Sequence, residues 1–133
     1  MPYHDYQPSP QLPHHRPGLG DDSGRVVKDG QGRGYLEWRW TPGMGVEIVN
    51  IEVDAQHRRT GVGRLLLRQL VDLVGPQGAV AVWATTRHNN GIAHDWYRAM
   101  GFRVCGRLYG FYDPDRAVLD ALLFIRGVKE PVP

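Results

Sequence analysis

The hexapeptide RRTGVG at residues 58–63 combines residue types that bind anions. Gly61 and Gly63 would let the backbone approach a ligand closely, because glycine has no Cβ. Arg58 and Arg59 add full positive charges and N–H donors that suit phosphate oxygens. A GxG string alone is weak evidence in a chain with 17 glycines. The flanking sequence decides between a phosphate site and an ordinary glycine turn.

The elements predicted on either side would aim backbone donors at this hexapeptide. Residues 46–53, VEIVNIEV, are rich in β-branched side chains and nearly alternate, which predicts a strand. Residues 64–74, RLLLRQLVDLV, place apolar side chains at helical spacing. A strand, a glycine turn and a helix start bring free N–H groups and the positive end of the helix dipole together. We expect this spot to hold a phosphate through Arg58, Arg59, Thr60, Gly61, Val62, Gly63 and Arg64, and through backbone amides as far as Leu65.

A second motif lies downstream, in residues 90–102, NGIAHDWYRAMGF. It predicts a short helix with Asn90 near its start and Gly101 as its C-terminal stop. With RxxGxG upstream, NxxAxxxYxxxGF downstream and a strand-like run at 79–83 between them, the chain resembles the GNAT superfamily of acetyl-CoA-dependent N-acetyltransferases. The resemblance covers roughly residues 34–128.

This resemblance implies a cosubstrate, acetyl-CoA, and a place for each part of it. The pyrophosphate would lie over the hexapeptide, and the strand backbone at Ile51 and Val53 would bind the pantetheine amides. The strand that carries residues 81–83 would splay away, leaving the thioester in the gap. Tyr97 matches the family's general acid, which protonates the departing thiolate; the alternative is a core aromatic. Asn90 is either a cofactor contact or only a helix cap.

The acceptor amine must lose a proton, so the resemblance also implies a base. Ribosomal-protein alanine N-acetyltransferases carry a glutamate where this chain has Thr85, which cannot act as a base. The histone-acetylating branch has a glutamate at a spacing that falls on Glu47. Glu52 is the reserve, and its odd separation from Glu47 predicts that it faces the other side of the strand. Glu47 is equally compatible with an ordinary surface carboxylate, and bulk water would suffice for an amine that arrives neutral.

Bulk composition bounds the remaining possibilities. A chain of 133 residues with 23% charged and 41% hydrophobic residues is typical of one globular domain. The formal net charge of +2 is too small to indicate nucleic-acid binding. No apolar run is long enough for a membrane span, and no signal peptide is recognisable. A single cysteine, Cys105, predicts a reducing compartment, which we take to be the cytoplasm, and we expect it to be a small core residue. We expect no metal, because the histidines near the N-terminus lack partners at ligand spacing.

The predicted organisation is a flexible arm rich in proline and histidine at residues 1–22, followed by one α/β domain at 23–133. The element order is β-β-β-α-β-α-β-β, with a mixed central sheet. GNAT domains usually open with a strand and two helices, and no helical periodicity precedes Val46, so the domain is interpreted as N-terminally truncated. A second subunit, or the arm itself, would then enclose the acceptor cleft. Trp38, Trp40 and the aromatic loop at 109–112 would form an exposed patch, which favours a homodimer over a monomer with an open cleft.

The leading functional hypothesis is therefore an enzyme that moves an acetyl group from acetyl-CoA to a primary amine, by direct attack in a ternary complex. A CoA-binding sensor or regulatory subunit with weak or no turnover is the alternative. A protein-interaction module whose glycine turn binds nothing is a third hypothesis, which the two motifs disfavour.

Overall fold

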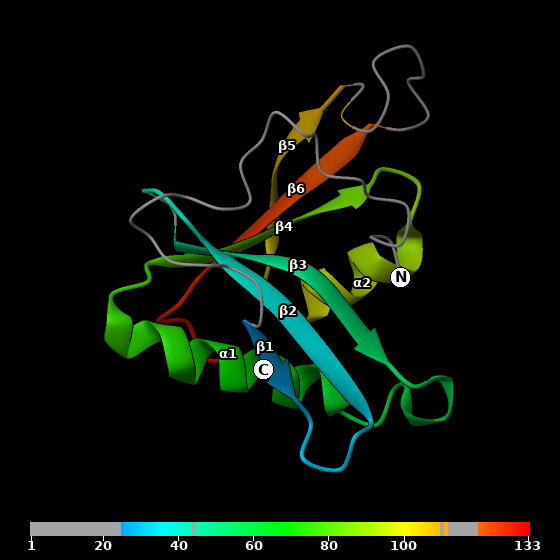
Figure 1. Ribbon diagram of the computed structural model, residues 1–133. Helices are drawn as coiled ribbons and strands as arrows, with labels where there is room; N and C mark the ends of the chain where they lie inside the picture. Colours follow the sequence, from blue (N-terminus) through cyan, green and yellow to red (C-terminus); the bar gives the residue numbers. More distant parts are fainter. Residues whose placement is uncertain (1–24, 44, 110, 112–119) are drawn as a thin grey trace.

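The computed structural model describes residues 25–43, 45–109, 111 and 120–133, so the predicted arm and most of the aromatic loop lie outside the described residues. Within these ranges the chain forms a sheet of six strands, in the order β1-β2-β3-β4-β6-β5, with two α-helices (Figure 1). The strands are β1 (Val26–Lys28), β2 (Gly34–Thr41), β3 (Gly45–Val53), β4 (Ala81–Arg87), β5 (Arg103–Leu108) and β6 (Ala121–Gly127). The helices are α1 (Val62–Val74) and α2 (Gly91–Ala99), and 3-10 turns lie at Ala55–His57 and Gly75–Gln77.

The predicted order of strands and helices and the mixed sheet are confirmed. The parallel pair is β3 with β4, while the other neighbouring strands are antiparallel. The sequence did not predict that β6 inserts between β4 and β5. β4 also begins at Ala81, two residues later than expected, and extends to Arg87.

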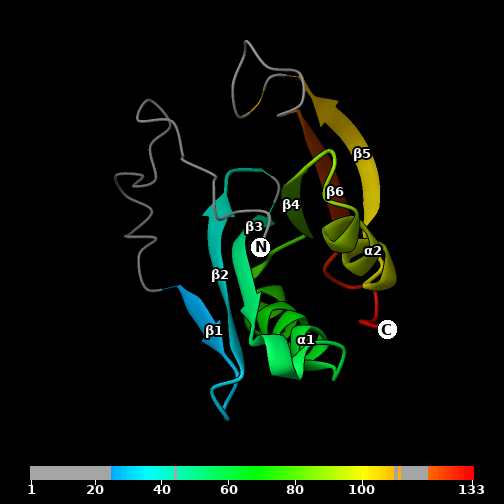
Figure 2. The same cartoon turned by 90° about the vertical axis from the view of Figure 1, so that its right-hand side faces the viewer.

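Both helices pack on the same face of the sheet, which we call the helix face. Val46 and Val82 are paired across β3 and β4, and both contribute to a core that includes Leu66 and Leu70 of α1. Figure 2 shows α1 beside β2 and β3. α2 packs on β6, where the rings of His94 and Tyr97 contact that of Phe124. One apolar face of the sheet therefore accounts for the amphipathic pattern of both helices.

The opposite face carries polar side chains, and no helix of the described residues covers it; we call it the helix-free face. Its residues are Tyr35, Glu37, Arg39 and Thr41 of β2, Glu47, Asn50 and Glu52 of β3, and Trp83 and Thr85 of β4. Candidate polar groups from three neighbouring strands are thus gathered on one surface.

A β-bulge in β3 corrects the predicted position of Glu52. Glu37 pairs with Asn50 and Trp38 with Ile48, so Val49 is an extra residue on β3. The extra residue reverses the alternation of all that follows it. Glu52 therefore lies on the same face as Glu47, and the expectation of opposite faces was wrong.

Burial corrects two further expectations. Trp38 is a core residue at 5% exposure and Trp40 packs edge-on against it, so neither belongs to an exposed aromatic patch. Cys105 is exposed rather than buried, like most residues of the edge strand β5, in which it is the extra residue of a second bulge. Of the predicted patch residues that the structure describes, Tyr109 retains the expected exposure, at 78%.

Strands β3 and β4 are paired over only three positions, Gly45 with Ala81, Val46 with Val82 and Glu47 with Trp83. Beyond them β3 continues to Val53 and β4 to Arg87 without pairing to each other. The two strands diverge toward their C-terminal ends (Figure 1), which agrees with the splay expected from the family resemblance. We call this gap the V, and its closed end lies at Glu47 and Trp83.

Candidate active site

The predicted anion loop forms the connection between the open end of β3 and α1. Gly61 caps the helix in a left-handed conformation, at φ 90°, and the N–H of Leu65 donates to its carbonyl oxygen at 3.0 Å. The N–H groups of Val62, Gly63 and Arg64 lie ahead of that hydrogen bond, at the positive end of the helix dipole. Exposed side chains surround them, namely Arg58, Arg59, Thr60 and Arg64. This arrangement suits a phosphate group.

Local contacts shape the loop and tie it to β3. Nε of Arg58 donates to the carbonyl oxygen of Val53 at 3.3 Å. Arg59 adopts a left-handed φ of 63°, and the hydroxyl of Thr60 donates to the carbonyl oxygen of His57. The turn therefore holds Arg58 beside the open end of the V.

The two glycines of the motif have different surroundings. A Cβ on Gly61 would meet only Nη1 of Arg64, at 4.0 Å, so the left-handed backbone is what requires glycine there. Gly63 is buried, and a Cβ on it would lie 2.9 Å from Nε1 of Trp96 in α2. The close contact with the indole of Trp96 by itself requires glycine at this position, and the approach of phosphate to the Gly63 backbone stays a prediction.

The edge of β3 that faces the V offers backbone groups to a ligand. The N–H of Asp54 donates to the carbonyl oxygen of Arg33, at 2.8 Å, and so points toward the β2 side. Because successive backbone groups of a strand alternate in direction, those of Val53 and Ile51 point the other way, into the V. An extended amide-containing chain could pair with them as a strand would, which fits the predicted role of both residues.

Glu47 stands at the closed end of the V and is only 3% exposed. Nε of Arg39, its cross-strand partner, donates to Oε1 of Glu47 at 2.7 Å. Burial raises the pKa of the Glu47 carboxyl above its ordinary value, and the charge and hydrogen bond of Arg39 oppose the rise. Glu47 is therefore a buried, paired carboxylate and not an ordinary surface group. Sequence reasoning did not single out Arg39, although its place across a hairpin from Glu47 was a usable signal.

Tyr97 lies on the helix face, at 1% exposure, with its hydroxyl oxygen buried. Its ring stacks on Phe124 with centroids 5.3 Å apart and meets the edges of Trp96 and Phe102. These surroundings are those of the core aromatic that was the alternative prediction. A catalytic role for Tyr97 stays a prediction.

Thr85 belongs to β4, and Asn90 follows that strand as the N-cap of α2. Oδ1 of Asn90 accepts from the N–H of Ala93 at 3.1 Å, so its cap role is present, while a cofactor contact stays a prediction. Thr85 is buried at 1% exposure on the helix-free face, two residues beyond Trp83. The structure thus brings Glu47 and Thr85 to one face, and Tyr97 to the other.

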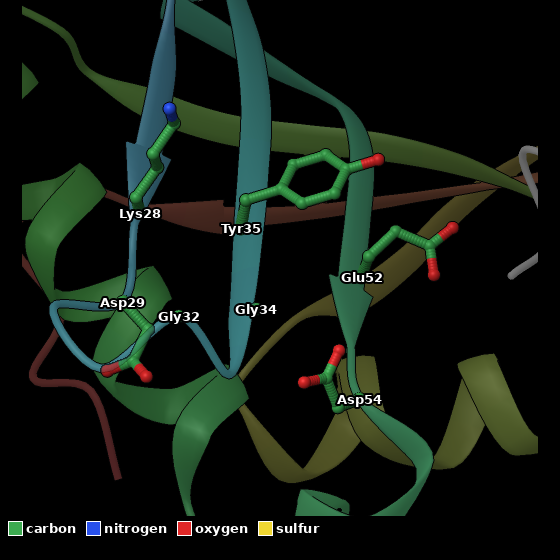
Figure 3. Close-up of a pocket in the computed structure, with 7 residues that line it drawn as sticks. All are labelled: Lys28, Asp29, Gly32, Gly34, Tyr35, Glu52 and Asp54. Atoms are coloured by element: carbon green, nitrogen blue, oxygen red, sulfur yellow. The ribbon is translucent and has the colours of Figure 1, made fainter.

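A hollow of about 250 Å³ lies where β2 begins and β3 ends. The sequence did not predict it. Figure 3 shows the ring of Tyr35 reaching from β2 toward β3, above Glu52 and Asp54. Burial, together with the charges of Glu52 and Glu37, raises the pKa of Tyr35. The hydrogen bonds of Arg33 lower the pKa of Asp29, at the rim, to about 2. The lining residues are Lys28, Asp29, Gly32, Gly34, Tyr35, Glu52 and Asp54.

Within the described ranges, no group of three or more His, Cys, Asp or Glu side chains could hold a metal ion. None of the helices in that part of the chain has the length and apolar character needed to cross a membrane.

Known proteins are similar to this chain in sequence and in fold. A ribosomal protein bS18 alanine N-acetyltransferase of Salmonella typhimurium is 32% identical over 76 residues, which is 57% of this chain and 51% of that protein. A streptothricin acetyltransferase of Streptomyces lavendulae is 37% identical over 72 residues, which is 54% of this chain and 36% of that protein. The chain thus matches about half or less of the length of these relatives.

A solved structure extends the likeness to the fold. A putative streptothricin acetyltransferase of Bacillus anthracis, in complex with acetyl coenzyme A, superposes with a TM-score of 0.66 at 22% identity. The match covers 71% of this chain and 54% of that one.

The family itself follows from a broader match. The sequence pattern of the acetyltransferase (GNAT) family matches residues 3–102, and so begins upstream of the region predicted from the two motifs. With the anion loop, the open edge of β3 and the V in place, this match shows that the chain belongs to the acetyltransferase (GNAT) family.

Proposed function

We propose that this protein is an N-acetyltransferase that moves an acetyl group from acetyl-CoA to a primary amine. The observation that carries the proposal is the divergence of β3 and β4, with an anion loop at the open end and a buried carboxylate at the closed end. The related fold from Bacillus anthracis was solved with acetyl coenzyme A, which supports the choice of cosubstrate.

Different residues would bind the pyrophosphate and the pantetheine of acetyl-CoA. The amides of Val62, Gly63 and Arg64 and the guanidinium groups of Arg58, Arg59 and Arg64 would hold the pyrophosphate, with Thr60 and Gly61 shaping the turn. Backbone groups of Ile51 and Val53 would hold the pantetheine amides within the V. Asn90, the N-cap of α2, is proposed as a further contact to acetyl-CoA.

The chemical step is a direct attack in a ternary complex. The amine nitrogen forms a bond to the thioester carbon while the carbon–sulfur bond breaks, and the two electrons of that bond leave with the thiolate. Glu47 would take the proton that the amine loses, and Tyr97 would supply a proton to the sulfur. Glu52, which the bulge brings to the same face as Glu47, is the reserve base, and water is sufficient for an amine that arrives neutral.

A catalytically weak CoA-binding subunit is the second candidate. One observation favours it, the burial of the Tyr97 hydroxyl among aromatic rings. The family resemblance adds that Thr85 stands where ribosomal-protein alanine N-acetyltransferases carry a glutamate. This candidate binds CoA at the same loop but releases no thiol from acetyl-CoA.

Two classes of acceptor follow from the relatives. One relative is named for an alanine of a ribosomal protein and the other for streptothricin, a small molecule. We propose a primary amine as the acceptor, on a small molecule or on a peptide or protein.

For location and assembly we propose a cytoplasmic homodimer with no nucleic-acid or membrane partner. The single, exposed cysteine supports a cytoplasmic location. The small net charge of +2 supports the absence of a nucleic-acid partner. The edge strand β5 supports the dimer, because Val104 and Leu108 on it and Tyr109 after it are exposed by 42%, 37% and 78%. Light scattering across a dilution series tests it, and a monomer at micromolar concentration would refute the dimer.

Thiol release from acetyl-CoA in the presence of a panel of amines tests the proposed activity. Amine-dependent release supports the enzyme. CoA binding by calorimetry without release for any amine supports the second candidate, and the absence of both contradicts the assignment of a CoA site.

A further inference from the structure

Trp83 occupies the last paired position before the V opens. It is the direct partner of Glu47 across the parallel pair of β3 and β4, so the two side chains leave the same face of neighbouring strands. Neighbouring strands are about 4.8 Å apart, which places the base of the indole beside the carboxylate. Any amine that reaches the closed end of the V from the helix-free face therefore meets both.

The indole of Trp83 has a fixed orientation. Its Nε1 donates to the hydroxyl oxygen of Thr41, at 2.9 Å, and that hydroxyl donates to the carbonyl oxygen of Gly45 at 3.2 Å. Thr41 belongs to β2, and Gly45 is its partner on β3. The ring therefore extends from β4 across β3 to reach β2.

Gly45 lies on β3 between Thr41 of β2 and Ala81 of β4, so the indole crosses beside it. A Cβ on Gly45 would lie 2.2 Å from the carbonyl oxygen of Ala81, so the close approach of β3 and β4 is what requires glycine here. The half-buried indole offers a flat apolar surface to the helix-free face.

The charges beside the indole are balanced. Arg39 donates to Oε1 of Glu47, so the pair carries no net charge, and Trp83 and Thr85 on the neighbouring strand are neutral. Glu37 and Glu52 are on the same face but lie further from Trp83, along β2 and β3. A balanced pair next to an aromatic surface gives little extra attraction to a polycation. It favours an amine whose apolar stem packs on the ring and whose nitrogen reaches the carboxylate.

We propose that Trp83, held by Thr41, is the specificity-determining wall of the acceptor site, and that it selects primary amines on an apolar stem over polyamines. This inference rests on the proposed function, because it names the substrate class of the same site. Trp83 is a binding residue in this proposal and takes no part in proton transfer.

The test reads binding directly, so that it gives a result whether or not the protein turns over. The indole N–H signals of the ¹⁵N-labelled protein are followed by NMR with CoA present, while benzylamine, hexylamine or spermidine is titrated. The signal that is lost in Trp83→Phe identifies Trp83. We expect saturable shifts of this signal with benzylamine and hexylamine, and about tenfold weaker binding of spermidine.

Two variants separate the indole from its support. Trp83→Leu should weaken hexylamine binding by about tenfold, as followed by calorimetry, while the affinity for CoA stays within about twofold. Thr41→Val keeps the indole but releases its N–H, and should weaken hexylamine binding by a smaller factor. Thermal melting and the CoA affinity show whether each variant is folded.

Three results would overturn the inference: no shift of the Trp83 signal with any amine, equal or tighter binding of spermidine, or unchanged hexylamine affinity in a folded Trp83→Leu variant. Failure of the proposed function shows itself differently, as the absence of thiol release in the wild-type protein. The Trp83 signal would still report amine binding in that case.

Discussion

Gly63 of α1 lies against the indole of Trp96 of α2, so closely that a Cβ on the glycine would be 2.9 Å from Nε1. The first turn of α1, which presents the anion loop, is thereby seated on α2. Gly63→Ala should destabilise the protein by about 1–3 kcal/mol, because it overpacks a buried helix contact. Urea denaturation measures this change. In a Trp96→Leu background, Gly63→Ala should cost much less stability than it costs in the wild-type protein. If the two substitutions are fully additive, the two residues are not in direct contact.

Gly61 should respond to substitution through its backbone conformation. Its φ of 90° is one that β-branched residues rarely adopt, whereas the space around a Cβ is open. Gly61→Val should therefore distort the loop and abolish CoA binding while the domain remains folded. Gly61→Asn is the matched control, because asparagine tolerates the left-handed region, and it should retain part of the affinity. Calorimetry that finds unchanged affinity in a folded Gly61→Val variant would remove the loop from the CoA site.

Tyr97→Phe tests the general acid. Phenylalanine preserves the stack on Phe124 and the edge contacts, so stability and acetyl-CoA affinity should change little. Turnover should fall by about 10², the usual value of a positioned proton donor. Wild-type turnover in this variant would assign Tyr97 to the core alone.

The pH dependence of activity should report Glu47. A base acts only when deprotonated, so the rate rises with pH through its pKa, and burial places that pKa above the ordinary glutamate value. Removing Arg39 removes the group that opposes the rise. In Arg39→Met the acidic inflection of kcat/KM should therefore move to higher pH, and in Glu47→Gln it should vanish. An inflection that is the same in all three proteins would assign it to a group other than Glu47.

Asp29 should contribute to acid stability in a defined window. Hydrogen bonds from Arg33 lower the pKa of Asp29 in the folded state from 3.8 to about 2. The ion pair with Arg33 therefore stabilises the folded state fully at pH values above 3.8. That contribution is lost as the pH falls from about 4 to about 2, where the folded carboxylate is protonated. Asp29→Asn lowers stability near neutral pH, and its difference from wild type in thermal midpoint should shrink across this window. A constant difference would contradict the shifted pKa.

Periodicity and motifs were sufficient to predict the order of the elements and the position of the anion loop. The run at 46–53 and the amphipathic helix after it depend on local pattern, which is visible in the chain itself. The cap at Asn90 and the stop at Gly101, at φ 88°, are local in the same sense.

What could not be predicted depends on contacts between distant residues. A bulge such as that at Val49 arises from the pairing of two strands, so alternation along β3 alone gave the wrong side for Glu52. The role of Gly63 required knowledge of Trp96, which is 33 residues further along the chain. The burial of Trp38 depends likewise on α1 folding back over β2, which no local pattern reveals.

The short seam of three residue pairs between β3 and β4 has a mechanical consequence. The sheet consists of two halves, β1-β2-β3 and β4-β6-β5, which we call plates. The three residue pairs of the seam and the packing of the helices hold the two plates together. A ligand that pairs with the open edge of β3 becomes the missing length of strand between the plates. By mass action its occupancy adds to the free energy of unfolding, by about 2.7 kcal/mol when it is present at a hundredfold excess over Kd. The lifetime of the protein against proteolysis is then set in part by the supply of that ligand.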